Sequence, residues 1–142
     1  MLKGIPSIIS PELLMTLMEM GHGDEIVLAD GNFPAASMAH RLLRADGHGV
    51  CELLEAVLKF FPLDIYVEKP VALMEVVPGD PVKPTIWKDY RKIITASGER
   101  FSDFEFVERF DFYERAEDAY AVVATGEKAL YANVILKKGV LS

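Results

Sequence analysis

Apolar positions along this chain recur in two spacings, one typical of helices and one typical of buried strands. The clearest helical spacing predicts a helix that begins at Val50 and ends before Pro62. Its apolar residues share one face: Val50, Leu53, Leu54, Val57, Leu58 and Phe61. An earlier helix is expected to begin at Pro11, capped by Ser10, and to stop at Gly21.

Short apolar runs without helical spacing predict strands over residues 25–30, 72–77, 104–109, 119–125 and 133–138. Two further helices are expected over residues 85–95 and 112–119, and a helical turn followed by an extended piece over residues 35–49. Strands that alternate with helices indicate an α/β fold in which helices cover a largely buried sheet. We therefore expect residues 1–142 to form one compact domain.

Charge and apolar content narrow the class of protein. The net charge is −7, from 15 Lys and Arg against 22 Asp and Glu, whereas nucleic-acid binding needs clustered cations. No apolar stretch approaches the roughly 20 residues that a membrane helix needs, and the N-terminus has no signal-peptide pattern. We expect a cytoplasmic protein that binds neither nucleic acid nor membranes.

The segment MGHGDEIVLADGNFPA surrounds one predicted strand with candidate site residues. His22 and Asp24 precede the strand, and Asp30 ends it. A strand of this length separates its two ends by roughly 17–20 Å, so His22 and Asp30 touch only if the first loop folds back. The flanking glycines permit such folding. The pattern leaves open whether His22 is an exposed turn residue or part of a site.

Several familiar site types find no support in the chain. The spacings of His22, His40 and His48 match no zinc or calcium pattern, so no metal site is predicted. The glycine-rich segments lack the Lys-Ser/Thr of a phosphate loop, and no nucleophile elbow is present. The single Cys51 cannot form an intrachain disulfide and is expected to pack against the core rather than act as a nucleophile.

A second group of polar and aromatic residues lies in the C-terminal third. The segment ERFDFYERA brings Arg109, Tyr113 and Arg115 close together in sequence. Tyr131 and Asn133 stand two apart, so in a strand both would point to the same side. An aromatic ring that covers C–H groups and an amide that meets hydroxyls would suit a polyol.

Taken together, several segments resemble those of the fucose mutarotase family, a sibling of the ribose pyranase (D-ribose mutarotase) proteins. The resemblance covers essentially the whole chain and rests on GIPSIISPELL, MGHGDEIVLADGNFPA, RADG, LLEAVLKFFPLD, ERFDFYERA and VVATGEKALYANVILKKGV. It implies an α/β subunit with a mixed sheet, and the interconversion of sugar anomers without metal or cofactor. It also implies a homo-oligomer, a ring such as a decamer or a smaller assembly, with sites near subunit boundaries.

The resemblance assigns roles to individual positions. The catalytic histidine falls on His22, and an acid/base pair of the animal-like members falls on Asp64 and Tyr113. Sugar-binding positions fall on Asp30, Arg109, Tyr131 and Asn133. Related sequences often have glycine in place of Ala132, so the backbone is expected to approach a ligand less freely here.

The implied reaction needs only proton transfer. Opening a cyclic hemiacetal removes the anomeric hydroxyl proton and delivers a proton to the ring oxygen, which suits histidine because it titrates near neutral pH. We expect interconversion of the α and β anomers of L-fucose. A ribose-type pyranase, a non-catalytic sugar-binding accessory and an interaction protein remain the alternatives.

Overall fold

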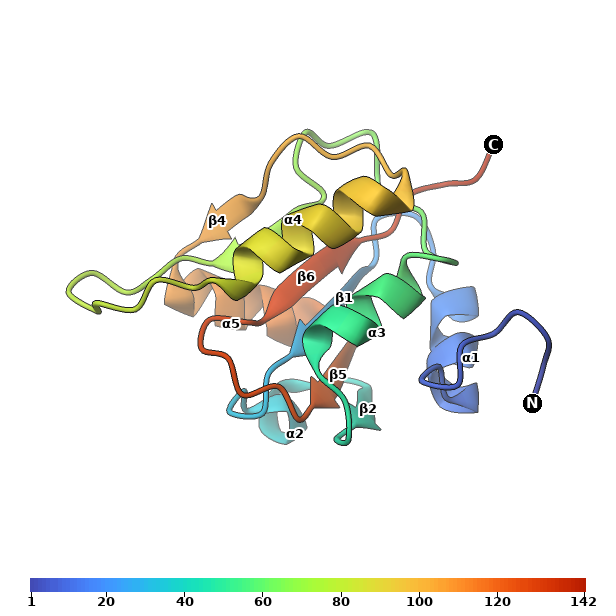
Figure 1. The fold of residues 1–142 in the computed structure, drawn as a ribbon, viewed down its shortest axis with the longest axis horizontal. Helices are drawn as coiled ribbons and strands as arrows, with labels where there is room; N and C mark the ends of the chain where they lie inside the picture. The colour runs from blue at the N-terminus through green and yellow to red at the C-terminus, as the bar shows by residue number, and fades with distance from the viewer.

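Six strands form one sheet in the order β2-β5-β1-β6-β3-β4 in the computed structural model, which describes residues 1–142 (Figure 1). The strands are β1 Glu25–Ala29, β2 Leu42–Ala45, β3 Val71–Met74, β4 Glu105–Val107, β5 Ala121–Thr125 and β6 Val134–Lys137. Only β6 runs antiparallel to its neighbours, β1 and β3; the other pairs are parallel. The predicted α/β class and mixed sheet are confirmed.

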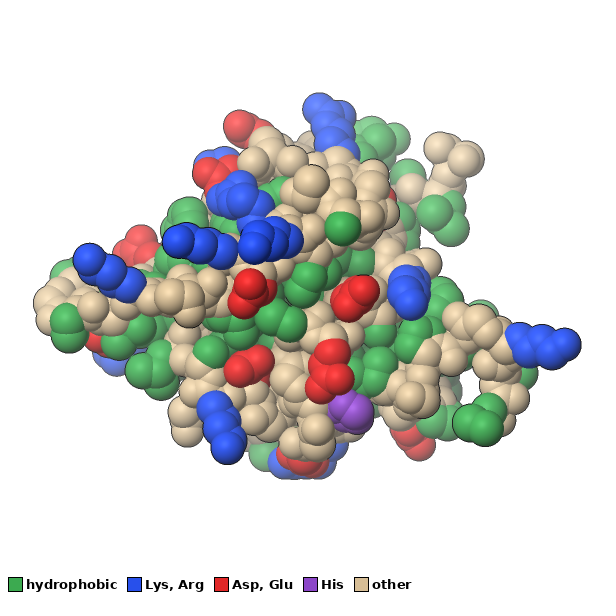
Figure 2. Space-filling model, in the orientation of Figure 1, with side chains coloured by type: hydrophobic (Ala, Val, Ile, Leu, Met, Phe, Trp, Pro, Cys, Tyr) green, Lys and Arg blue, Asp and Glu red, His purple; other side chains and the backbone are tan.

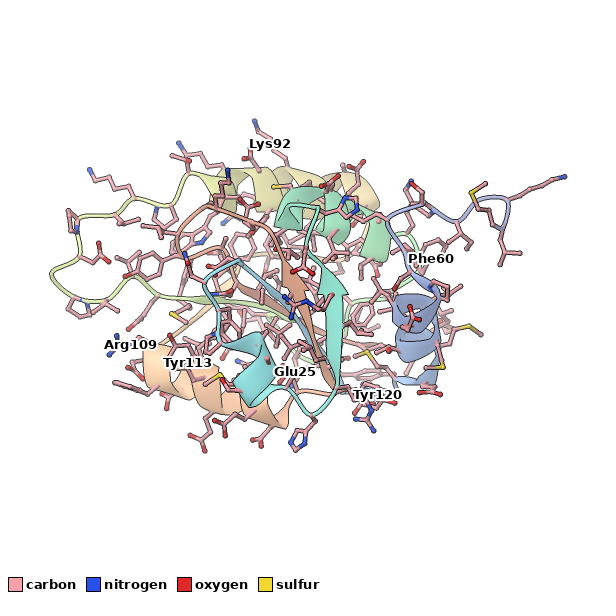
Figure 3. The ribbon with its side chains drawn as sticks, turned by 90° about the horizontal axis from the view of Figure 1, so that it is seen from below. Glu25, Phe60, Lys92, Arg109, Tyr113 and Tyr120 are labelled. Carbon is pink, nitrogen blue, oxygen red and sulfur yellow. The ribbon has the colours of Figure 1, made fainter.

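Helices cover both faces of this sheet. They are α1 Pro11–Glu19, α2 Ala35–Met38, α3 Val50–Val57, α4 Ile86–Ser97 and α5 Arg109–Asp118. Side chains of α1, α3 and α4 pack with one face in a cluster of 25 buried residues, and α2 and α5 pack on the other face in a cluster of 12. Figure 3 shows the resulting three layers, with α3 and α4 above the strands and α2 and α5 below.

Local signals in the sequence account for the starts of α1 and α3. Helix α5 instead begins at Arg109, three residues before the predicted start and inside the segment predicted as the strand 104–109. The Ser10 hydroxyl accepts a hydrogen bond from the backbone N–H of Leu13 at 3.1 Å, as a helix cap does. Helix α1 ends at Glu19 with the extended Met20 as its C-cap, so the predicted stop residue, Gly21, directly follows the cap. The regular part of α3 ends at Val57, and hydrogen-bonded turns continue as far as Phe61.

The strand directions give the sheet two chemically different edges. All five mutually parallel strands end at one edge, which we call the C-terminal edge, and begin at the opposite, N-terminal edge. Strand β6 runs the other way, so it begins at the C-terminal edge and ends at the N-terminal edge. Ligands of open α/β sheets bind where parallel strands end and loops diverge, so the C-terminal edge is the first place to search for a site.

The helices and the visible surface agree with the composition. None of the helices is both long and apolar enough to cross a membrane. Figure 2 shows the face formed by α3 and α4, where acidic and basic side chains are interspersed with apolar ones. Lys and Arg side chains gather over the upper part of this face and Asp and Glu side chains over its middle, so both signs of charge are present on it (Figure 2).

Candidate functional site

A pocket of about 260 Å³ opens at the C-terminal edge of the sheet. Five residues singled out in the sequence line it: Asp30, Arg109, Tyr113, Tyr131 and Asn133. Sites for drug-sized ligands usually measure roughly 300–1,000 Å³, so this pocket suits a single small ring.

Asp30 and Asn133 form the buried polar floor of the pocket. The backbone N–H of Asp30 donates to Asn133 Oδ1 at 2.7 Å, which fixes the amide and leaves its NH₂ group to serve as a donor. One Asp30 carboxylate oxygen accepts the backbone N–H of Asn32 at 3.0 Å. Burial raises the pKa of Asp30 above its ordinary value, and the bond from Asn32 only partly opposes that rise.

Tyr131 reaches the pocket by an unusual backbone conformation. It is the only residue other than glycine with a positive φ, 56°. The Trp87 indole N–H donates to the Tyr131 carbonyl at 2.8 Å, and the Tyr90 hydroxyl donates to the Ala132 carbonyl at 2.6 Å. The expectation that Tyr131 and Asn133 share a strand face was wrong, since β6 begins only at Val134. A strained turn, rather than strand alternation, brings both to the pocket.

Helix α5 supplies a further wall of the pocket. Arg109 and Tyr113 stand four residues apart, so they share a face of the helix. Figure 3 shows both toward the N-terminal end of α5, beside the projecting loop of residues 75–85. The Tyr113 ring lies edge-on to Phe33, with centroids 5.8 Å apart. Arg115 belongs elsewhere: its guanidinium binds Glu25 and Glu105 at 2.6 and 2.9 Å.

His22 and Asp64 form a separate pair at the N-terminal edge. His22 Nε2 lies 3.2 Å from Asp64 Oδ1, which also accepts the backbone N–H of Tyr66 at 3.0 Å. The Asp64 side chain is 4% exposed and that of His22 46% exposed. In the tautomer in which Nε2–H donates to Asp64 Oδ1, Nδ1 is the ring nitrogen left for a ligand.

The loop before β1 does not fold back toward Asp30. The backbone N–H of Gly23 donates to the Lys138 carbonyl at 2.8 Å, and Lys138 N–H donates to the Asp24 carbonyl at 2.8 Å. Strand β1 has five residues, and at about 3.3 Å per residue it separates its ends by roughly 16 Å. The chain thus brings the five pocket residues together and holds His22 with Asp64 at the opposite end of the same strand.

Asp80 is a pocket residue that the sequence did not single out. It lies in the segment Pro78-Gly79-Asp80-Pro81, which reads as an ordinary turn, so no signal marked it. Cys51 is half-buried and packs against the core as expected, and burial raises the pKa of its thiol to about 11. No three His, Cys, Asp or Glu side chains gather as metal ligands.

A carboxylate, an amide, a guanidinium and aromatic rings around a small pocket define an α/β protein that binds a small hydroxylated molecule. Comparison with known families is consistent with this class. Residues 3–141 match the RbsD / FucU transport protein family. The chain belongs to that family.

Relatives in this family carry informative names. The chain is 55% identical over 147 residues to the fucose mutarotase of Homo sapiens, covering 99% of this chain and 95% of the relative. It is 54% identical over 140 residues to an L-fucose mutarotase of Actinobacillus pleuropneumoniae serotype 5b (strain L20), covering 99% and 97%. The structure is similar to the fucose mutarotase of Streptococcus pneumoniae in complex with L-fucose, with a TM-score of 0.95, 55% identity and coverage of 99% and 100%.

Proposed function

We propose that this chain is an L-fucose mutarotase, an isomerase that interconverts the α and β anomers of the sugar. The observation that carries the proposal is the full-length similarity, at 55% identity, to a fucose mutarotase solved with L-fucose. The pocket at the C-terminal edge offers the matching chemistry, with polar side chains on its floor and aromatic rings on its walls. Metal and cofactor are not needed, because acid/base groups are sufficient for ring opening and reclosure.

Different parts of the pocket meet different parts of the sugar. Asp30, Asn133 and Arg109 hold the ring hydroxyls, since a carboxylate accepts while an amide NH₂ and a guanidinium donate. The rings of Tyr113 and Tyr131 cover the C–H face and the methyl group of this 6-deoxy sugar. Ribose has no such methyl group, and its hydroxyls would meet the buried polar groups less well.

The reaction consists of ring opening and reclosure. A base removes the proton of the anomeric hydroxyl, the bond between C1 and the ring oxygen breaks, and an acid protonates that oxygen. The resulting aldehyde turns about its C1–C2 bond and closes on the other face, with the two proton transfers reversed. We assign these transfers to His22, oriented by Asp64, and to Tyr113 in the pocket. Positioned acid/base groups of this kind contribute about 10²–10⁴-fold each.

The distance between the His22–Asp64 pair and Asp30 supports a site that is shared between two copies of the chain. His22 and Asp64 lie at the opposite end of β1 from Asp30, so one copy cannot bring both to one sugar. We propose that the His22–Asp64 pair of one copy completes the pocket of a neighbouring copy. Each site then lies at a subunit boundary, and the assembly is a closed homo-oligomer.

The surface around His22 supports this arrangement. A hollow of about 400 Å³ lies beside it, lined by apolar side chains of α1 and the C-terminal segment. Met18 is 77% exposed and Leu141 85% exposed in the isolated chain. Exposed apolar side chains grouped in this way are typical of a surface that another molecule covers. Light scattering should find a multiple of the 15.8 kDa subunit, and a monomer at working concentration would contradict the shared site.

Saturation-transfer NMR tests the activity directly. One anomeric resonance of L-fucose is irradiated, and loss of signal at the other anomer reports exchange, with chelator present throughout. We expect saturable acceleration by the protein, and a preference over D-ribose of roughly 5- to 150-fold, the discrimination available from one or two misfit polar groups.

Other outcomes would select the alternatives. Faster exchange of D-ribose than of L-fucose would indicate a pyranase. Binding of L-fucose without accelerated exchange would indicate a sugar-binding accessory. Exchange that appears only when the chelator is omitted would overturn the metal-free mechanism.

A further inference from the structure

The turn of residues 77–80 holds the hydroxyl of Tyr131 from two sides. Asp80 N–H donates to the Val77 carbonyl at 3.0 Å, closing a four-residue turn in which Gly79 has a φ of 89°. Proline before such a glycine is the usual pattern of a type II turn. The closed turn presents the backbone N–H of Val77 and the carboxylate of Asp80 toward the same phenolic oxygen.

Both groups of the turn bind that oxygen. The Tyr131 hydroxyl donates to Asp80 Oδ2 at 2.6 Å and accepts the Val77 N–H at 3.3 Å. This pairing lowers the pKa of Asp80 and raises that of Tyr131, because ionised carboxylate and intact phenol favour one another. Asp80 is therefore a carboxylate that accepts, and the only proton of the Tyr131 hydroxyl is committed to it.

The opposite end of Tyr131 is also fixed. Trp87 holds its carbonyl, and its backbone occupies the left-handed region that side chains rarely adopt. A residue in this conformation persists only when its surroundings determine it. With both ends held, the ring stands as a rigid wall of the pocket, and its hydroxyl can accept hydrogen bonds from a ligand but cannot donate.

We propose that Asp80 is a positioning residue of the sugar site, which acts through Tyr131 by holding its ring in place and keeping its hydroxyl an acceptor. The inference rests on the proposed function and extends it to a residue outside the expected set. A sugar hydroxyl that meets Tyr131 must then be the donor, which makes the turn of residues 77–80 part of substrate selection.

A structural role for Asp80 has to be separated from a positioning role, because Asp80 Oδ1 also accepts the Val82 N–H at 3.0 Å. Tyrosine labelled with ¹³C at Cζ reports each phenol individually, and Tyr131→Phe assigns the resonance. We expect Tyr131 to ionise at lower pH in Asp80→Ala than in the wild type. Asp118→Asn, an exposed acid on α5 away from the pocket, serves as control. An unchanged Tyr131 titration in Asp80→Ala would overturn the proposal.

Exchange kinetics supply the second readout. Loss of Asp80 in Asp80→Ala should raise the half-saturating L-fucose concentration about tenfold, with little change in maximal rate. Asp80→Asn keeps an acceptor oxygen and should remain within about threefold of the wild type. The double variant Asp80→Ala/Tyr131→Phe should be no worse than the worse single variant, because both remove one interaction.

Contrary results have distinct meanings. If Asp80→Asn loses maximal rate as severely as Asp80→Ala and alters the pH profile, Asp80 transfers protons and the positioning role is wrong. Additive losses in the double variant would also overturn it. If the wild type binds L-fucose without accelerating exchange, the proposed function fails. The positioning role is then decided by the sugar concentration that shifts the Tyr131 resonance in the wild type and in Asp80→Ala.

Discussion

Mixing two inactive variants should restore activity if the site is shared between copies. His22→Ala removes the proposed proton-transfer group at the N-terminal edge, and Asp30→Asn removes the carboxylate of the pocket. His22→Ala should lose about 10²-fold or more of the exchange rate. Asp30→Asn should lose about 10- to 100-fold at low L-fucose concentration, because a hydrogen bond to a charged group is lost. In a mixed assembly, however, some boundaries pair an intact His22 from one copy with an intact Asp30 from its neighbour.

The size of the recovery follows from the geometry. If the site is shared as proposed, with His22 and Asp30 held about 16 Å apart by β1, every complete site draws one half from each of two copies. In a randomly mixed, equimolar assembly, about a quarter of the boundaries combine two intact halves, and another quarter combine two defective halves. We therefore expect about 25% of wild-type exchange from the mixture.

The assay is saturation transfer on L-fucose after the two variants are unfolded and refolded together, with mixed assemblies verified by native mass spectrometry. Mixing His22→Ala with Asp64→Ala is the matched control, since both defects fall on the same half and no boundary can be intact. Verified mixed assemblies with no more activity than their parents would refute the shared site. Full activity of His22→Ala alone would remove His22 from the mechanism.

Three further predictions concern the packing around the site. Burial raises the pKa of Asp30, so the wild type loses stability as pH rises above the ordinary value of 3.8. In urea titrations, the free energy of unfolding of Asp30→Asn should exceed that of the wild type by more at pH 7 than at pH 3.5. An equal difference at the two pH values would contradict the burial argument. Tyr90→Phe leaves the Ala132 carbonyl without its donor and should lower the free energy of unfolding by about 1–3 kcal/mol, whereas an unchanged denaturation midpoint would show that water replaces the hydroxyl. Gly139→Ala would place a Cβ 2.6 Å from the Leu63 carbonyl and should destabilise by about 1–3 kcal/mol, while a thermal melt identical to the wild type would show that the backbone relaxes freely.

The sequence predicted the elements well because their signals are local. Apolar spacing located α3, and the Ser10-Pro11 pair located the start of α1. The predicted ends of the strands were less accurate, because pairing with strands distant in sequence decides where each strand ends. The predicted strand over residues 72–77 stops at Met74, which pairs with Val107, the last residue of β4.

The site was only partly predictable, because its geometry depends on contacts distant in sequence. Asp64 reaches His22 across 42 residues, and no spacing rule announces that pair. Tyr131 and Asn133 were expected to lie together because of strand alternation. In the structure a turn, held by the hydrogen bond from Trp87, brings them together instead. Asp80 was missed because a turn motif and a binding residue look identical in sequence.

Strand β6 sets the distance between the pocket and the His22–Asp64 pair. Asn133 immediately precedes the strand at the pocket, and Lys138 follows it at the turn that holds His22. An inserted residue would lengthen the strand by about 3.3 Å and turn its following side chains to the opposite face. If the proposed assembly is a closed ring, that error repeats at every boundary and the ring cannot close. Natural length variation in this family should therefore accumulate in loops that leave the body, such as residues 75–85 at the left of Figure 1, and spare β6.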